Sequence, residues 1–314
     1  MRSYSLIAPA KINLYLEIIG DRPDGYHELA MVLQSIDLAD LVSLRALGTE
    51  QIRVNCSHPL VPVDHTNLAY RAAELMKLQF PEAFNRFGGV EITIDKRIPV
   101  GAGLAGGSTN AAAVLVGLDL MWQLGLTKAE LQDLGAKLGS DVPFCVAGGT
   151  SLATGRGEML APLPTIDGLY AVLVKYRSLS VSTVWAYQSY RQQYRDTYRP
   201  HEEMVGDRLH SVHSGPMVAA ITARQYSHLG ELLRNDLEKV VLPAYPAVNQ
   251  LKETFTSLGN LGTMMSGSGP TVFALARSAA EAEEMARSLQ TAIPNPDLEV
   301  WVTKFVPYGV QLAS

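Results

Sequence analysis

Cysteine is scarce in this sequence, and its scarcity narrows the kinds of protein that the chain can encode. Only Cys56 and Cys145 occur, far apart and outside any CxxC pattern. Neither a disulfide framework nor a zinc site is therefore expected. A chain without disulfides suits a reducing compartment, and we expect a cytoplasmic protein.

Positive charge and long hydrophobic runs are lacking as well. The chain has 26 Lys and Arg residues against 31 Asp and Glu residues, a formal net charge of -5. Binding to nucleic acid or to an anionic membrane needs clustered positive charge, so neither partner is expected. The longest nearly apolar stretch, Ala111 to Trp122, is interrupted by Asp119 and is too short to span a bilayer. Any anionic ligand must therefore bind at a local site.

The remaining composition is that of an ordinary globular protein, with 47% hydrophobic and 18% charged residues. A chain of 314 residues exceeds the usual size of one hydrophobic core, so two domains are expected. The glycine- and proline-rich string TGRGEMLAPLPTIDG marks a boundary near Leu163. We therefore expect domains at 1–162 and 163–314, the second built of helices packed on a small sheet.

The N-terminal region has the pattern of two strands joined by a turn. From Lys11 to Ile18 apolar and polar residues alternate, so Lys11 and Asn13 are expected on the same face. The turn segment DRPDGYHE follows, and residues 29–38 form a second predicted strand. This unit carries Tyr26 and His27 beside its turn.

Further along the chain, residue spacing predicts helices over 66–80, 108–124 and 127–138, and a strand over 90–95. The helix at 127–138 opens with a capping box. The polar run from Asp196 to Gly215 is expected to be an exposed loop.

The glycine-rich string GAGLAGGSTN has GxGxxG spacing, which makes a dinucleotide site the first alternative. A dinucleotide fold needs a buried first strand and an acidic residue at the end of the next strand, whereas here the preceding strand alternates and Asp119 falls inside a helix. The string also nearly matches a Walker A loop, but Gly107 stands where the lysine should be. Both of these interpretations are disfavoured.

What survives both comparisons is a site for phosphate. Glycines let backbone N–H groups approach an anion closely, and the start of the following helix adds the positive end of its dipole. The alternative is that the glycines only permit tight packing. Four glycines ending in Ser-Thr-Asn at a helix start favour phosphate. Ser108 could reach a phosphate oxygen or Mg²⁺, although serine at a helix start is commonly just an N-cap.

Two charged residues are candidates for phosphoryl transfer, which needs positioning, charge neutralisation and an acceptor for a hydroxyl proton. Lys11 lies in the apolar segment IAPAKINLYLEI and needs an anionic partner if it is covered, or it is simply an edge-strand lysine in water. Asp141, in LGSDVPFCVAGG, follows a helix end and precedes an apolar run with the character of a strand. A carboxylate there can orient a hydroxyl, or it is only a turn or cap residue.

Three segments together resemble the GHMP kinase superfamily: PAKINLYL, PVGAGLAGGSTNAA and MMSGSGPTVFA, in this order and at suitable distances. The strings DRPDGYHELAMVLQSIDLAD and GSDVPFCVAGGTSLATGRGE resemble one branch of it, which acts in the non-mevalonate isoprenoid pathway. The resemblance covers nearly the whole chain.

This resemblance implies an α+β fold. Its N-terminal ATP-binding domain would be of the ribosomal protein S5 domain 2 type, its C-terminal domain would be ferredoxin-like, and the SGSGPT turn would return to the phosphate region. It also implies a reaction, in which ATP with Mg²⁺ phosphorylates the C2 hydroxyl of a methylerythritol that carries a cytidine diphosphate group.

The resemblance further implies residue roles. Asp141 would accept or orient the hydroxyl proton, and Lys11 would hold Asp141 and the phosphoryl group. The substrate would contact Asn13, Tyr26, His27 and Tyr187. Trp185, which lies close to Tyr187 in the sequence, is the alternative aromatic residue. The ATP-binding residues would be Pro99, Val100, Gly101, Ala102, Gly103, Leu104, Ala105, Gly106, Gly107, Ser108, Thr109 and Asn110. Ala102 and Ala105 stand where related loops often have further glycines, and such small residues preserve the backbone approach.

Two rival functions remain open from the sequence. One is another GHMP kinase, acting on homoserine, mevalonate or a sugar. The other is a non-catalytic module that binds a nucleotide. The sequence also leaves open whether the protein is a monomer or a homodimer.

Overall fold

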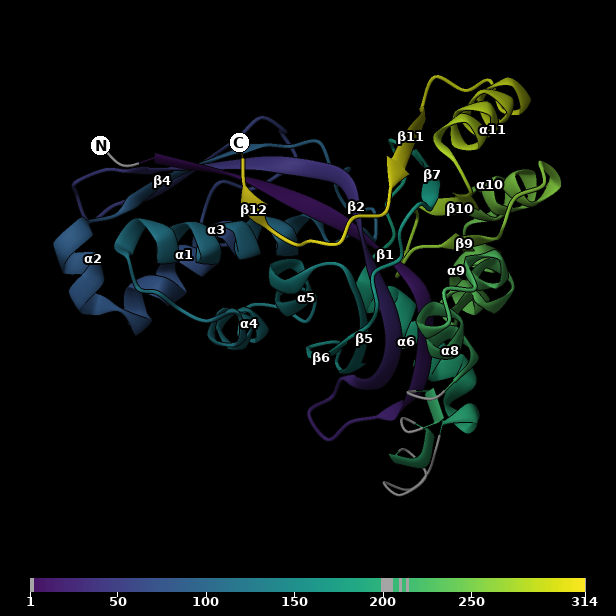
Figure 1. Cartoon of the computed structure of the whole chain (residues 1–314), viewed down its shortest axis with the longest axis horizontal. Helices are drawn as coiled ribbons and strands as arrows, with labels where there is room; N and C mark the ends of the chain where they lie inside the picture. The colour runs from purple at the N-terminus through teal and green to yellow at the C-terminus, as the bar shows by residue number, and fades with distance from the viewer. Residues whose placement is uncertain (1–2, 199–205, 209–210, 213–214, 314) are drawn as a thin grey trace.

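A computed structural model describes residues 3–198, 206–208, 211–212 and 215–313 as two β-sheets with helices packed on them (Figure 1). The α+β architecture predicted from the sequence is confirmed. The larger sheet contains β1 (Ser3–Asp21), β2 (His27–Ala46), β3 (Ile52–Cys56), β4 (Val90–Asp95), β5 (Thr150–Gly155), β6 (Met159–Pro162), β8 (Arg234–Asn235) and β12 (Gln311–Leu312). The smaller sheet contains β7 (Tyr170–Tyr176), β9 (Thr263–Met265), β10 (Val272–Ala276) and β11 (Leu298–Lys304).

The helices of the described residues fall between these strands. In the first half they are α1 (Leu68–Gln79), α2 (Pro81–Phe87), α3 (Gly106–Trp122), α4 (Lys128–Ala136) and α5 (Val142–Ala147). In the second half they are α6 (Thr183–Tyr194), η1 (Arg195–Thr197), α8 (Pro216–Thr222), η2 (Tyr226–Leu232), α9 (Glu238–Ala244), α10 (Pro246–Ser257) and α11 (Ala279–Ala292).

Strands β1 and β2, purple in Figure 1, run from the region beside helices α1 and α3 to the region beside helices α6 and α8. They pair antiparallel, with irregularities at Pro9/Ala10, Asn13/Tyr15 and Ile18/Gly20. Both strands extend well beyond the predicted 11–18 and 29–38, because neighbours cover them on both faces and much of their length is buried. Lys11 and Asn13 therefore lie near the middle of the molecule.

Helix α3 packs against β1 and β2 at very close range. Its residues 111–115 are all fully buried. A Cβ atom at Gly117 would approach a Leu44 methyl group to 2.9 Å, so only glycine lets the helix lie this close to the sheet. This packing fixes the start of α3, and with it the end of the glycine-rich loop.

The second half of the chain contributes to both sheets. The smaller sheet is antiparallel with strand order β11-β7-β10-β9, whereas β8 and β12 pair with β1 of the larger sheet. The two halves of the sequence are therefore interlocked along β1. The boundary between residues 162 and 163 stays a prediction.

Local predictions agree with the structure except after Asp141 and within residues 196–215. Helices α1, α3 and α4 and strand β4 lie where expected, and the capping box of Thr127 and Glu130 is formed. The apolar run after Asp141 was predicted as a strand, which is wrong, because it forms helix α5. A proline in the first turn favours a helix start, and an apolar run buried on all sides carries no periodicity that distinguishes helix from strand.

Three further expectations concern the chain as a whole. Cys56 and Cys145 are free thiols, as predicted. Within the described ranges, no helix combines the length and apolar character needed to cross a membrane. Much of the predicted exposed loop at 196–215 lies outside the described residues, but the prediction is wrong for residues 206–208 and 211–212, which are helical. Val212 is buried in a hydrophobic cluster, and Arg208 donates to Glu17, so tertiary contacts favour a helix there.

Candidate active site

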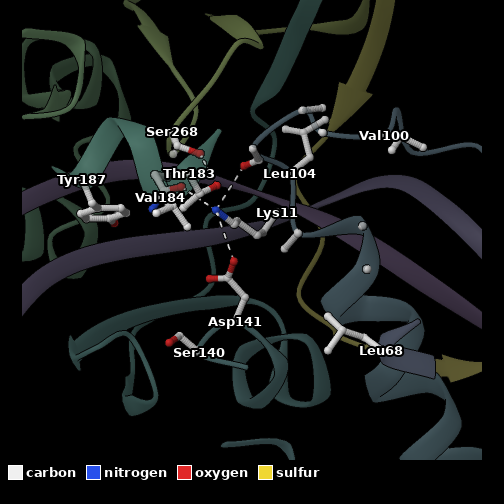
Figure 2. A pocket seen from close by; sticks show the side chains of 18 of the residues that line it. Lys11, Leu68, Val100, Leu104, Ser140, Asp141, Thr183, Val184, Tyr187 and Ser268 are labelled. Atoms are coloured by element: carbon white, nitrogen blue, oxygen red, sulfur yellow. Dashed lines mark hydrogen bonds and ion pairs between the residues drawn. The ribbon is translucent and has the colours of Figure 1, made fainter. Parts of the chain in front are cut away.

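A cavity of about 680 Å³ lies between the glycine-rich loop, β1, the start of α5 and helix α6. This volume is within the range of small-molecule sites. In Figure 2, Lys11 stands at its centre, Asp141 approaches from the side of α5, and Thr183 and Tyr187 face it from α6. Leu68 and Val100 lie on the opposite side of Lys11. The cavity therefore has two ends joined at Lys11.

The ammonium group of Lys11 is the centre of the polar contacts. Its Nζ donates to Asn13 Oδ1 at 2.7 Å and to the carbonyl oxygen of Gly103 at 3.2 Å, and it lies 3.9 Å from Asp141 Oδ2. Lys11 is buried, whereas the Asp141 side chain is 31% exposed. A buried ammonium among acceptors is held ready for a further anion.

Asp141 stands at the N-cap position of α5, yet its side chain makes no capping hydrogen bond. The carboxylate is instead turned toward Lys11 and the cavity (Figure 2). The alternative interpretation of Asp141 as a cap residue therefore does not describe its side chain. Its position leaves a carboxylate oxygen accessible to a ligand in the cavity.

The glycine-rich loop is packed against the turn at residues 266–269. Gly103 has φ +74°, and a Cβ atom on it would lie 2.3 Å from the carbonyl oxygen of Ser266. The Ser266 hydroxyl donates to the Gly103 carbonyl at 3.2 Å. Asn235 in turn donates to the carbonyls of Met265 and Gly267. The SGSGPT turn thus packs against the glycine-rich loop, and its further role at the phosphates, which the resemblance implies, stays a prediction.

The predicted ATP-binding residues divide into two groups. Residues 99–107 and Asn110 line the cavity, whereas Ser108 and Thr109 are not among its lining residues in the part of the chain that the structure describes. Ala105 adopts a left-handed φ of 59° immediately before α3. Individual ATP contacts, and the contact of Ser108 with Mg²⁺, stay predictions.

Sequence reasoning missed a buried ion pair beneath the loop. The fully buried carboxylate of Asp40 pairs with Lys96, and also accepts from the backbone N–H groups of Arg97 and Ile98 and from Asn110 Nδ2. Burial lowers the pKa of Lys96, although Asp40 opposes this shift. The signal available in the sequence was Asp40 itself, an acidic residue within the largely apolar segment SIDLADLVSL. Asp40 fixes both ends of the glycine-rich loop.

The other end of the cavity is aromatic. The His27 ring lies 5.2 Å from the Tyr187 ring at a tilt of 32°, and Tyr26 is more than half exposed beneath the guanidinium of Arg156. Trp185, the neighbouring candidate, packs edge-on against Tyr245. Tyr26, His27 and Tyr187, here called the aromatic corner, line the end of the cavity between α6 and the β1–β2 turn.

His27 carries an unpartnered nitrogen in this corner. Its ring is buried, and Nε2 has no hydrogen-bond partner among the described residues, with Asp21 Oδ1 at 3.8 Å. Burial, with Arg191 nearby, lowers the pKa of His27 to about 4. The imidazole is therefore neutral at neutral pH and can offer one donor and one acceptor. Burial also raises the pKa of Tyr187, so its hydroxyl stays protonated.

Arg191 connects helix α6 to the turn between β1 and β2. Its Nε donates to Asp21 Oδ1 at 2.7 Å, and Nη2 donates to the carbonyl of Gly25 at 2.9 Å. The two elements that carry the aromatic rings are thereby held at a fixed separation.

Comparison with known proteins places this site in a family. Residues 67–149 match the model of the GHMP kinases N terminal domain, and residues 213–295 match that of the GHMP kinases C terminal region. The chain is 63% identical over 313 residues to a 4-diphosphocytidyl-2-C-methyl-D-erythritol kinase of Trichodesmium erythraeum, with 100% of both chains covered. It is 62% identical to the protein of that name from Nostoc punctiforme, covering 100% of this chain and 99% of the other.

Solved structures agree with the sequence matches. A crystal structure of 4-(cytidine 5'-diphospho)-2C-methyl-D-erythritol kinase superposes with a TM-score of 0.72 at 31% identity, covering 96% of this chain and 98% of that one. A homoserine kinase from Cytophaga hutchinsonii superposes with a TM-score of 0.75 at 19% identity, covering 100% and 98%. At that identity the second match shows the fold alone.

The fold and the site therefore define a GHMP kinase, an ATP-dependent small-molecule kinase. Within this class, the chain belongs to the family of 4-diphosphocytidyl-2-C-methyl-D-erythritol kinases.

Proposed function

We propose that this protein transfers the γ-phosphoryl group of ATP to the C2 hydroxyl of 4-diphosphocytidyl-2-C-methyl-D-erythritol, giving the 2-phosphate and ADP in the non-mevalonate route to isoprenoid precursors. The observation that carries the proposal is that one cavity holds the Lys11–Asp141 pair between the glycine-rich loop and the aromatic corner. Such a cavity seats a phosphate donor at one end and a base-bearing acceptor at the other.

Asp141 and Lys11 are the proposed catalytic residues. The acceptor hydroxyl would lie against the Asp141 carboxylate, which orients it and takes its proton late in a dissociative transfer. Lys11, 3.9 Å from that carboxylate, would neutralise charge that develops on the phosphoryl oxygens. Asn13 fixes the direction of the ammonium group, because its Oδ1 accepts a hydrogen bond from Lys11 Nζ at 2.7 Å.

The aromatic corner would recognise the cytosine. A base stacks on aromatic faces and presents donors and acceptors at its edge. Tyr26 and Tyr187 are the proposed stacking partners, and His27 the partner for the edge. His27 lines the cavity, and its neutral imidazole supports this role because it can offer one donor and one acceptor to the edge of a base.

Mg²⁺ fits this site only as a companion of the nucleotide. No group of three or more His, Cys, Asp or Glu side chains in the described ranges could hold a metal ion by itself. Mg²⁺ commonly binds through one or two carboxylates together with substrate phosphates. Asp141 is the carboxylate available beside the phosphate loop, and the Ser108 hydroxyl is a further proposed contact. When bound, the ion neutralises charge on the phosphates.

We further propose that the enzyme works in the cytoplasm on this small molecule, as a monomer or a homodimer.

An ADP-release assay with the purified protein tests the proposal. ADP should form only when ATP, Mg²⁺ and the cytidine-bearing acceptor are all present, and homoserine, mevalonate and sugars should not replace the acceptor. The variant Asp141→Asn should lose at least about 100-fold in kcat while binding ATP as before, because its amide cannot take the hydroxyl proton but keeps an oxygen that can face Mg²⁺. Asp37→Asn, at an exposed carboxylate of β2, is the matched control. Unchanged turnover in Asp141→Asn would reject the assigned role.

A further inference from the structure

A second cavity, of about 290 Å³, lies among β1, α6, β8 and α9. The described residues that line it do not overlap with those of the active-site cavity. Most ligand pockets are largely apolar, but nearly all of this wall is charged or polar. Its lining residues are Glu17, Ile18, Ile19, Tyr190, Thr197, Arg208, Arg234, Asp236 and Lys239.

The charges around this cavity do not cancel. Three cationic side chains face two carboxylates, which leaves one positive charge in surplus. The carboxylates of Glu17 and Asp236 are 10% and 2% exposed, whereas the cations of Arg208, Arg234 and Lys239 are 29%, 41% and 44% exposed. The negative groups are thus set into the wall, and the positive groups remain accessible to a ligand.

The carboxylates are also committed to partners within the protein. Asp236 Oδ2 accepts the backbone N–H of Ile18 at 2.9 Å, and Oδ1 accepts from Arg234 Nε at 3.2 Å. Glu17 Oε2 accepts from the Tyr15 hydroxyl at 2.6 Å and from Arg208 Nη2 at 2.7 Å. With their oxygens occupied, the carboxylates are poor ligands for a cation.

The cations keep hydrogen-bonding capacity. An ammonium group has three N–H bonds and a guanidinium has five. Lys239 Nζ lies 3.2 Å from Asp236 Oδ1, and this one ion pair does not use all of its N–H bonds. Burial opposes the charge of Lys239, but Asp236 raises its pKa overall, so the ammonium is retained at neutral pH. The hydrogen bond from Arg234 Nη1 to the Tyr15 hydroxyl is long, at 3.5 Å, and therefore weak.

We propose that this second cavity is a binding site for a small phosphate-bearing anion. An oxyanion can accept from Lys239 and Arg234 together, and charge-assisted bonds of this kind are about twice as strong as neutral ones. The hydroxyl of Tyr190 on the same wall supplies a neutral donor. The cavity has less than half the volume of the active site, which suits a phosphate or a small organic phosphate rather than a nucleotide.

Calorimetric titration of the full chain tests this site. The protein is first saturated with a non-hydrolysable ATP analogue and Mg²⁺, so that the glycine-rich loop is filled. Inorganic phosphate and glycerol phosphate are then titrated separately. We expect binding with a Kd tighter than about 10 mM, and a loss of about 10-fold or more in Lys239→Gln.

Lys252→Gln is the matched control, because Lys252 also forms an ion pair, with Glu238, but lies outside the cavity. Tyr190→Phe provides a second probe that removes one hydroxyl and keeps the ring. Binding of phosphate alone would identify the free ion as the ligand, and tighter binding of glycerol phosphate would identify an organic phosphate. No binding of either probe, or equal binding in Lys239→Gln and the control, would overturn the proposal and leave a structural ion-pair network only.

Discussion

The buried Asp40 carboxylate gives the sharpest test of how the glycine-rich loop is held. Its Oδ1 accepts from the backbone N–H groups of Arg97 and Ile98, at 2.7 and 2.8 Å, and its Oδ2 accepts from Lys96 and Asn110. The change Asp40→Asn keeps an oxygen for the first two donors. The new amide NH₂ group then faces Lys96 Nζ and Asn110 Nδ2, which are also donors, so these hydrogen bonds are lost.

The expected loss of stability follows from burial. The side chains of Asp40 and Lys96 are 0% and 5% exposed, and breaking such a pair by removing one partner costs about 3–5 kcal/mol. With an m value of about 1–3 kcal/mol/M in urea, the unfolding midpoint should fall by at least about 1 M. The KM for ATP should rise about 10-fold, because Asp40 anchors the residues that precede and follow the glycine-rich loop. The KM for the acceptor should rise less.

Urea unfolding followed by circular dichroism measures the first effect, and steady-state kinetics measures the second. Asp37→Asn is the control, because Asp37 accepts only the backbone N–H of Lys304 and an amide oxygen replaces that acceptor. In a Lys96→Met background the cost of Asp40→Asn should drop by about 2 kcal/mol, since the lost partner is already gone. The reasoning is refuted if Asp40→Asn stays within about 1 kcal/mol of the control, or costs the same in both backgrounds.

Three further outcomes are expected. His27→Gln should raise the KM for the cytidine-bearing acceptor about 10- to 100-fold and leave the KM for ATP unchanged, with the exposed His228→Gln as control; equal effects on both substrates would contradict the assignment. Since the pKa of His27 is about 4 in the folded protein, against an ordinary value of 6.5 for an unfolded chain, its stabilising contribution is present above pH 6.5 and lost toward pH 4. The difference in unfolding free energy between the native protein and His27→Gln should therefore change by about 3 kcal/mol over that window, measured by urea unfolding at each pH, and a constant difference would refute it. Gly103→Ala should cost about 3 kcal/mol or more and lower kcat, because its Cβ would overlap the Ser266 carbonyl, whereas Gly168→Ala, at φ +78° with open space, should cost about 1–2 kcal/mol; similar costs would argue against the close approach of the two turns.

Local patterns in the sequence predicted much of the fold. The alternation at residues 11–18, the helix of small residues after the glycines, and the capping box at Thr127 depend on neighbours a few residues away, so periodicity and local chemistry suffice to predict them. The run 142–147 could not be assigned in this way, because burial on every side removes the periodic signal.

The candidate site was predicted in part. Alternation placed Lys11 and Asn13 on one face, and the structure joins them by a hydrogen bond. The Asp40–Lys96 pair escaped detection, because its residues are 56 positions apart and only the pairing of β2 with β4 brings them together. The choice of Tyr187 over Trp185 as the residue that faces the cavity likewise depends on how α6 packs.

The sequence by itself determined the class of the molecule, because the glycine-rich loop, the strand that carries Lys11 and the segment around Asp141 are local segments with recognisable patterns. Only the tertiary structure decided that these segments line one cavity with His27 and Tyr187. It also decided that three cations and two carboxylates gather in a second cavity. Such contacts join residues far apart in the chain, and their geometry follows from the packing of the two sheets rather than from any local pattern.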